Sequence, residues 1–389
     1  MTAIKDSVHD YIPVTGVAAD LLDVPAVQRL RHIKQLSTVR LVYPSANHTR
    51  FEHSLGVYHL ADRACSQLGI DGQRAERVRA AALLHDVGHG PYGHQTEDVI
   101  RRRTGRHHDE VGDLLGEGRL ATVLDDHGLD PDAVADLVDG RGELGQLISG
   151  ELDVDRTDYL LRDAHHTGVP YGTVDPGRFL RALGLLDGDL VLAPGNVQTA
   201  ESLLVARALM DATVYRHHVS RIAGSMLERA CERLLDAPDG PTVERFRRLT
   251  DGELLGELVD STVAGEFGRR IRDRDLYKRA VWAERDAVPP SLRELDFAET
   301  TAAEAEIADE AGVEPRRVVV DAPPEPTLKE SAVRVVVNGE IRRLDDHSPL
   351  VEALHAAART RWRLGVYAPE PQTDAVGRAA ERVLGIDRG

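Results

Sequence analysis

The sequence has few cysteines, few lysines and no long apolar run, and each shortage removes a class of protein. Its 389 residues contain two cysteines, too few for a disulfide framework and without the spacing of a metal motif. No apolar run approaches the roughly 18 residues of a transmembrane helix, and the N-terminus lacks the apolar stretch of a signal peptide. We therefore expect a cytoplasmic protein that needs no disulfide and contacts no membrane.

Basic charge is also scarce, and almost all of it is arginine. Lysine and arginine total 48 against 65 acidic residues, which gives a net charge of -17. Proteins that follow a nucleic-acid backbone normally present a basic face, so we expect no nucleic-acid partner. We interpret the acidity as a solvated surface that maintains solubility.

Apolar residues recur at helical spacing over much of the chain. From Ala18 to about Ala237 they fall three or four positions apart, as in Leu30, Ile33 and Leu36, and Val243 to Trp282 also suggests helix. Glycine and proline mark turns between these segments. The pattern predicts a mostly α protein.

The last hundred residues have a different pattern. Pro289-Pro290 interrupts the helical spacing and indicates a boundary, with a helical domain at 1–290 and a small C-terminal α+β subdomain at 291–389. In the second part we expect strands at 317–321 and 332–337, a turn at Asn338-Gly339 that forms a hairpin, and a helix over 350–362. We expect this subdomain to brace the helical body or a subunit interface.

Histidine and aspartate are concentrated in His85-Asp86-Val-Gly-His89-Gly-Pro-Tyr-Gly-His94. Neighbouring side chains on a helix point about 100° apart, so adjacent ligands of one ion are unusual there. A helix that ends after Leu84, stopped by the following glycines and proline, would leave both side chains at the mouth of a loop. Imidazole and carboxylate together suit a divalent cation with room for water or a phosphate oxygen.

Two further segments could complete such a site. His53 lies upstream in Arg50-Phe-Glu-His53, and Asp155 lies in the acidic segment 153–163, where helical spacing places Asp155, Tyr159 and Arg162 or Asp163 on one face. A solvated helix face with internal ion pairs would explain the acidic segment equally well if it stood alone.

These motifs, in this order, resemble those of the HD-domain metal-dependent phosphohydrolases. The resemblance is strongest to the branch that contains the SAM and HD domain deoxynucleoside triphosphate (dNTP) triphosphohydrolase and its prokaryotic dGTPase-like relatives. It extends over more than half of the chain, through the segments at 6–9, 23–36, 48–57, 85–94, 153–168 and 215–219.

The resemblance implies an HD-domain helical fold and a set of metal ligands. The ligands would be His53, His85, Asp86 and Asp155, holding one divalent ion: manganese, magnesium, iron, zinc or nickel. Carboxylates suit a hard cation and histidines a first-row transition metal, so the ligand set leaves the identity of the ion open.

The resemblance also implies how phosphate chemistry would proceed. His94 would be the general acid, with His89 and His108 on phosphate oxygens. Asp109 stands where the family often has glutamate, which would change how the neighbouring imidazole is oriented. A surface loop remains the alternative for His108.

A second group of residues matches family positions that hold the triphosphate and the sugar. Tyr215 would exclude a ribose 2'-hydroxyl, and Tyr159 and Asp163 would face the 3'-hydroxyl; arginine suits bidentate phosphate contacts. The alternative for Arg207 and Tyr215 is a packing contact between helices. The full set is Arg50, Arg156, Tyr159, Asp163, Arg207 and Tyr215.

Four residues resemble those with which the animal member of this family, the SAM and HD domain enzyme, binds guanine at an allosteric site. They are Asp23, Gln28, Arg31 and Phe51. They suggest a homo-oligomer, a dimer or tetramer, activated by GTP or dGTP. The alternative is that these residues serve only the structure of the helix predicted around 23–36.

We expect a metal-dependent dNTP triphosphohydrolase that yields deoxynucleoside and triphosphate. Two alternatives stay open. One is another HD phosphohydrolase acting on nucleoside monophosphates, cyclic dinucleotides or alarmones, although the motif after Asp86 differs from the His-Asp-Gly-Tyr-Pro pattern of cyclic-dinucleotide enzymes. The other is a nucleotide sensor or nucleic-acid-binding module with little catalysis.

Overall fold

The computed structural model describes residues 2–186, 188–326 and 332–386. The chain forms two compact units that alternate along the sequence. The first comprises Met1–Val214, Pro241–Leu254 and Lys329–Val351, and the second comprises Tyr215–Gly240, Leu255–Leu328 and Glu352–Gly389. Because neither unit is one continuous segment, they provide no single boundary to compare with the one near residue 290, which stays a prediction.

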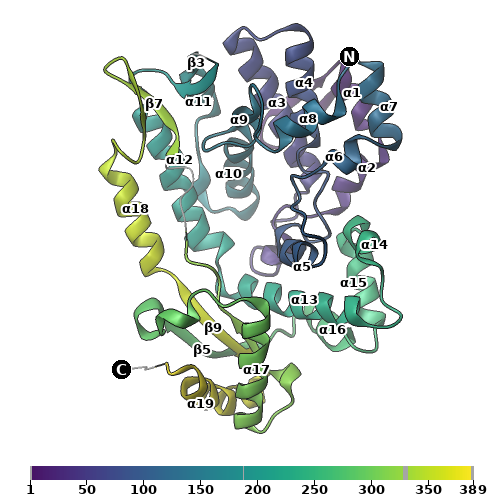
Figure 1. Ribbon diagram of the computed structural model, residues 1–389, viewed down its shortest axis with the longest axis vertical. Coiled ribbons are helices and arrows are strands. Elements are labelled where there is room, and N and C mark those ends of the chain that lie inside the picture. The colour runs from purple at the N-terminus through teal and green to yellow at the C-terminus, as the bar shows by residue number, and fades with distance from the viewer. Residues whose placement is uncertain (1, 187, 327–331, 387–389) are drawn as a thin grey trace. The chain divides into compact units, whose positions relative to one another are not determined.

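The fold is mostly helical with small sheets, as the sequence predicts (Figure 1). The helices of the first unit are α1 (Val17–Leu22), α2 (Pro25–Arg29), α3 (Arg50–Leu68), α4 (Gly72–Leu84), α5 (His94–Thr104), α6 (Gly112–Leu115), α7 (Gly118–Asp126), α8 (Pro131–Val138), α9 (Gly145–Ile148), α10 (Val154–Thr167), α11 (Pro176–Ala182), α12 (Val197–Met210) and α14 (Val243–Arg248). Helices α15 (Asp251–Asp260) and α18 (Pro349–Thr360) each extend from one unit into the other.

Helices α3 and α4 lie side by side in the first unit (Figure 1). Helix α3 begins with a capping box in which Thr49 and Glu52 bond each other's backbone. Small residues let α4 pack closely, since Ala80, Ala81 and Ala82 are fully buried. Helix α4 ends at Leu84, so the prediction that His85 and Asp86 follow a helix end is confirmed.

Helix α10 carries the acidic segment and packs against α3. It begins after Asp153, whose side chain accepts a hydrogen bond from the Arg156 amide, and ends at Gly168 in the left-handed conformation. The predicted helical spacing of this segment is therefore confirmed. The first turns of α3 and α10 and the end of α4 meet at one place, which is where the candidate site lies.

The first unit has two small sheets. Strands β1 (Thr2–Asp6) and β2 (Asp10–Val14) form a hairpin, and β3 (Leu183–Leu186), β4 (Asp189–Leu192), β7 (Arg334–Val337) and β8 (Glu340–Arg343) form a sheet in that order. Strands β7 and β8 are antiparallel around Asn338-Gly339, with both turn residues at positive φ, as a type I' turn requires. The predicted hairpin is confirmed.

The second unit has its own apolar core around a three-stranded sheet of order β5-β9-β6. Its elements are α13 (His218–Asp236), α16 (Gly265–Arg272), β5 (Lys278–Glu284), α17 (Phe297–Ala311), β6 (Val319–Asp321), β9 (Arg363–Ala368) and α19 (Thr373–Leu384). Helices α17 and α19 pack together, and their buried residues join those of the sheet in one core.

The prediction of helix over Val243 to Trp282 is wrong at the end of that segment. Residues Lys278–Glu284 form strand β5, because Val281 and Ala283 are buried two positions apart and the backbone pairs with β9. A short apolar run does not distinguish helix from strand, and pairing with a distant strand makes this segment a strand.

Among the described residues, no helix is both long and apolar enough to cross a membrane.

Candidate active site

Three predicted ligands lie together where α3 meets the end of α4. His53, His85 and Asp86 each offer an atom within 4.8 Å of the others, and the two imidazole Nε2 atoms are 3.2 Å apart. His53 is 1 % exposed and Asp86 is 3 % exposed. Two ring nitrogens facing each other beside a carboxylate are arranged as ligands of one ion would be.

The other ring nitrogen of each histidine is held by an acceptor. His53 Nδ1 donates to Asp158 Oδ2 at 2.7 Å, and His85 Nδ1 donates to the Ala82 carbonyl at 2.9 Å. An Nδ1 proton on both rings leaves both Nε2 lone pairs directed into the site. Metal-ligating histidines in proteins are commonly fixed by such an outer hydrogen bond.

Asp86 supplies both charge and an unsatisfied atom. Its Oδ1 accepts from Arg50 Nη1 at 2.8 Å, whereas its buried Oδ2 has no hydrogen-bond partner among the described residues. Burial raises the pKa of Asp86, but the charges of Arg50 and of the neighbouring histidines outweigh it and hold the pKa well below its usual range. A buried anionic oxygen without a partner is costly, and a cation would satisfy it.

Asp155 adds a second carboxylate from the first turn of α10. Its Oδ1 lies 2.9 Å from His53 Nε2 and 3.8 Å from His85 Nε2. Burial lowers the pKa of His53, but Asp155 and Asp158 outweigh it and raise the pKa to about 10, so their combined negative charge favours a cation here. The residues fit a divalent metal ion, and the cluster indicates divalent metal binding.

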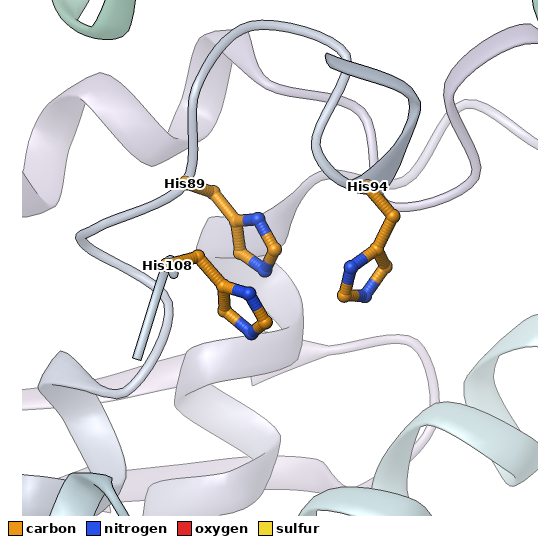
Figure 2. Close-up of side chains that lie close together, drawn as sticks. All are labelled: His89, His94 and His108. Atoms are coloured by element: carbon orange, nitrogen blue, oxygen red, sulfur yellow. The ribbon is translucent and has the colours of Figure 1, made fainter. Parts of the chain in front are cut away.

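Three further histidines form a separate group beside the first. Figure 2 shows the rings of His89 and His108 one over the other, with His94 beside them. The stacked rings have centroids 3.9 Å apart at an angle of 13°, and His94 meets His89 edge-on at 4.7 Å. The structure therefore brings together all three histidines to which the sequence assigns phosphate contact or proton transfer.

Glu97, one turn into α5, contacts two of these rings. Its carboxylate accepts from His94 Nδ1 at 2.8 Å and forms a short contact with His108 Nδ1. Burial lowers the pKa of His108, but Glu97 outweighs it and raises that pKa. Glu97 thus occupies the orienting place that the sequence assigns to Asp109; Asp109 lines the pocket, and its own role stays a prediction.

The second group suits an anion better than a second cation. Burial and the positive charge of Arg50 lower the pKa of His89 well below its usual range. The lone pairs of parallel stacked rings do not converge on one point, and a charged arginine opposes another metal ion. The positive charge of Arg50 and the raised pKa of His108 favour phosphate oxygens.

Two glycines let the loop carrying these histidines approach its neighbours. A Cβ on Gly88 would lie 1.9 Å from the His108 carbonyl oxygen. Gly93 has a φ of +52°, and a Cβ there would lie 2.5 Å from Arg50 Nη2. Larger residues would push His108 or Arg50 out of place.

One pocket joins the two groups. It is lined by residues of both groups and by further polar and apolar side chains, namely Gln35, Arg50, His53, His85, Asp86, His89, His94, His108, Asp109, Val138, Ile148, Ser149, Asp155 and Tyr159. The chain therefore presents a cation site and a polar, partly cationic surface in the same cavity.

The other residues predicted to bind substrate have differing surroundings in the structure. Arg156 forms short contacts with Asp153 and the Gly150 carbonyl, and the buried Asp163 binds His48 Nε2 at 2.7 Å. Arg207 is near enough to Tyr159 to lower its pKa, against the larger raising effect of burial. Tyr215 ends the π-helical turn Asp211–Tyr215 and belongs to the second unit. The substrate roles of all these residues stay predictions.

Three of the four predicted allosteric residues are in contact. The Arg31 guanidinium lies 3.6 Å from the centre of the Phe51 ring, and Arg31 Nε donates to Gln28 Oε1 at 2.8 Å. Gln28 in turn donates to the Leu22 carbonyl at 2.6 Å, and Asp23 is exposed beside it. Their regulatory role stays a prediction.

Sequence reasoning missed several residues that support the site. Asp158 lies inside the acidic segment, and its four-residue spacing from Arg162 could have identified it. In the structure Arg162 Nε donates to Asp158 Oδ2 at 2.9 Å. Glu97 could have been found from its position three residues after His94. Gln35 lines the pocket with a buried Oε1 that has no hydrogen-bond partner in the described parts of the chain, and nothing in the sequence marks it.

Comparison with known proteins identifies the family. The HD domain matches residues 50–163, and the HD associated region matches residues 174–389. An uncharacterized protein of Methanocaldococcus jannaschii is 32% identical over 95% of this chain and 80% of its own length. Deoxynucleoside triphosphate triphosphohydrolase SAMHD1 of Homo sapiens is 29% identical over 72% of this chain and 54% of its own length.

A solved structure agrees with this assignment. The crystal structure of a phosphohydrolase from Bacteroides thetaiotaomicron has a TM-score of 0.73 and 26% sequence identity, covering 95% of this chain and all of its own. The matched HD domain extends from Arg50 to Asp163 and so includes both histidine groups. The chain belongs to the HD-domain family of metal-dependent phosphohydrolases and carries the HD-associated region.

Proposed function

We propose that this protein is a metal-dependent dNTP triphosphohydrolase, which converts a dNTP and water to deoxynucleoside and triphosphate. The observation that carries the proposal is the contact between the two histidine groups. Arg50 Nη1 binds Asp86 Oδ1 at 2.8 Å, and His89 Nε2 lies 3.3 Å from the same oxygen. A cation site and an anion-binding surface that share one carboxylate suit a phosphate ester placed across both.

The proposed metal ligands are His53, His85, Asp86 and Asp155. A bound divalent ion supplies Lewis-acid activation of a phosphoryl oxygen and of water at neutral pH. Arg50 keeps two buried nitrogens, Nε and Nη2, without hydrogen-bond partners among the described residues, so both remain available to phosphate oxygens.

His94 is placed to act as the general acid. Its side chain is 65% exposed and lines the pocket, while Glu97 holds Nδ1 at 2.8 Å. Desolvation, with the charges of Arg50 and His108, lowers the pKa of His94, and the Glu97 carboxylate on Nδ1 opposes that shift. The protonated ring can pass its Nε2 proton to the departing 5'-oxygen. His108 and His89 would bind the oxygens on which negative charge accumulates.

The relatives support the substrate class. SAMHD1 of Homo sapiens and its homolog in Dictyostelium discoideum are named deoxynucleoside triphosphate triphosphohydrolases, and each is 29% identical to this chain. The matches span 54% and 59% of those proteins. The extension of their substrate to this protein is our proposal.

The test is product analysis with the metal-reconstituted protein and each of the four dNTPs. Deoxynucleoside and tripolyphosphate should appear, and His85→Ala and Asp86→Ala should abolish their formation. Monophosphate with pyrophosphate, or diphosphate with phosphate, would indicate another phosphohydrolase. Activity that survives both substitutions would contradict the metal assignment.

Sugar selection is proposed to depend on Tyr159, Asp163 and Tyr215, with Arg156 and Arg207 on the triphosphate. In the structure Arg156 pairs with Asp153, so binding of a triphosphate would require it to exchange a carboxylate for a phosphate. GTP should be cleaved much more slowly than dGTP. Equal rates would remove the assigned role of Tyr215.

Activation by guanine nucleotide is proposed for the cluster of Asp23, Gln28, Arg31 and Phe51. The Arg31 guanidinium lies 3.6 Å from the centre of the Phe51 ring, and a base could take the place of the guanidinium or extend the stack. Addition of GTP or dGTP should raise the rate of dNTP hydrolysis and shift the chain to a dimer or tetramer. No change in rate or assembly would contradict this part of the proposal.

A further inference from the structure

The loop between α4 and α5 carries His89 and ends at His94, yet it has little regular structure of its own. Residues 89–93 contain two glycines and a proline, and Tyr92 adopts a φ of +59°, which is unusual for a residue with a side chain. A loop of this kind holds two imidazoles in register only if other parts of the chain fix its backbone.

Arg29, the last residue of α2, fixes the first half of the loop. Its Nη1 donates to the His89 carbonyl at 2.9 Å, while Nε and Nη2 donate to the carbonyls of residues 247, 248 and 249 at 2.7–2.9 Å. Burial and the nearby charge of Arg248 lower the pKa of Arg29 to about 10, so it stays charged at neutral pH. One guanidinium therefore ties the loop to the end of α14.

Asp251, the first residue of α15, fixes the second half. Its Oδ1 accepts from the Tyr92 amide at 2.6 Å, and its Oδ2 accepts from the Lys34 amide at 2.9 Å. The helix does not need this carboxylate as a cap, because Thr250 and Glu253 already form a capping box. The Asp251 side chain is left to hold the loop.

From these contacts we infer that Arg29 and Asp251 are positioning residues that hold His89 in place for phosphate binding and His94 in place for proton transfer. Both act on the backbone of the loop, and neither lines the pocket. The inference rests on the proposed hydrolysis, since it assigns the two imidazoles work in that reaction. In the described parts of the chain, neither residue hydrogen-bonds to any of the four proposed metal ligands, so metal binding should be independent of them.

The test uses Arg29→Lys and Asp251→Asn in the metal-loaded full chain, with Asp260→Asn, an exposed change at the other end of α15, as the control. Lysine cannot reach four carbonyls, and asparagine can accept only one of the two amide protons. Both variants should lose about 10- to 100-fold in kcat with KM changed less than about 2-fold. Metal content and the melting temperature should remain near those of the wild type.

Unchanged kcat in both folded variants, or a loss explained by lost metal, would overturn the inference. If a variant does not fold, amide hydrogen exchange of the wild-type holoenzyme decides. The Tyr92 amide should then exchange as slowly as amides in α3, and exchange at the rate of an open loop would overturn the inference. Because this readout needs no substrate, an inactive wild type would contradict the proposed function alone.

Discussion

Asp158 accepts a hydrogen bond from Nδ1 of His53 at 2.7 Å, and its side chain is completely buried. The same carboxylate binds His9 Nε2 at 2.6 Å and Arg162 Nε at 2.9 Å. Burial raises the pKa of Asp158, but Arg162 and the two histidines outweigh it and hold the pKa well below its usual range. A permanent carboxylate therefore sets the tautomer of a proposed metal ligand.

Replacement of that carboxylate by an amide should weaken metal binding. In Asp158→Asn the side-chain amide can donate to Nδ1, which would favour a proton on His53 Nε2, the proposed metal-binding atom. We expect metal affinity to fall about 10- to 100-fold. Calorimetric titration with manganese measures this, with the exposed Asp125→Asn as the control, and an affinity equal to the wild type would exclude the orienting role.

Arg162 should matter for stability more than for binding. Its guanidinium is 0% exposed and bridges Asp158 and Asp6, at 2.9 Å and 2.8 Å. Arg162→Met leaves two buried carboxylates without their counterion and should lower the free energy of unfolding by about 3–5 kcal/mol. Urea denaturation measures this. Arg141→Met, which breaks exposed ion pairs, should cost less than about 1 kcal/mol.

Glu97 should affect turnover. In Glu97→Gln one amide cannot serve both His94 and His108 as an acceptor, so one ring loses its orientation. We expect kcat to fall by about 10- to 100-fold while the metal stays bound. Steady-state kinetics beside Asp98→Asn, the neighbouring exposed carboxylate, would show the difference. Equal rates for the two variants would assign Glu97 a structural role only.

A partly buried histidine should make stability depend on pH. Burial, with the charges of His9 and Arg63, lowers the pKa of His59 to about 4. The unfolded chain takes up a proton near pH 6.5, so the contribution of this neutral ring is complete above pH 6.5 and is lost as pH falls toward 4.

The variant His59→Gln should reduce that dependence. Between pH 7 and pH 5 its loss of unfolding free energy should be smaller than that of the wild type by about 1 kcal/mol, after allowance for partial exposure. Urea titrations at the two pH values measure it. His32→Gln, at an exposed position, should keep the wild-type slope, and the same slope in all three proteins would contradict the prediction.

The helices around the site were predictable because local signals agree there. Apolar spacing, the glycines after Leu84 and the acid before α10 are all properties of neighbouring residues, so the ends of α4 and α10 could be read from the sequence. The sequence offered His53 as a possible partner of His85 and Asp86, and the resemblance assigned all three as ligands. Spacing could not group them, because His53 lies in α3 and the other two residues follow the end of α4.

The parts of the fold and of the site that the sequence did not predict depend on contacts between distant segments. Strand β5 looks helical until its pairing with β9 is known, and Asp251 lies 159 residues from the Tyr92 amide that it binds. Glu97 was overlooked because Asp109 stands directly beside His108 in sequence, whereas one turn of α5 brings Glu97 to the same ring. Sequence separation conceals such partners, and only tertiary structure identifies them.

The most direct test is hydrolysis of dGTP in water enriched in oxygen-18, with mass spectrometry of both products. Attack of water on the α-phosphorus breaks the bond to the 5'-oxygen and places the heavy oxygen in the triphosphate. We predict one labelled oxygen in tripolyphosphate and none in deoxyguanosine. Label in the nucleoside, or release of pyrophosphate or phosphate in place of triphosphate, would contradict the account.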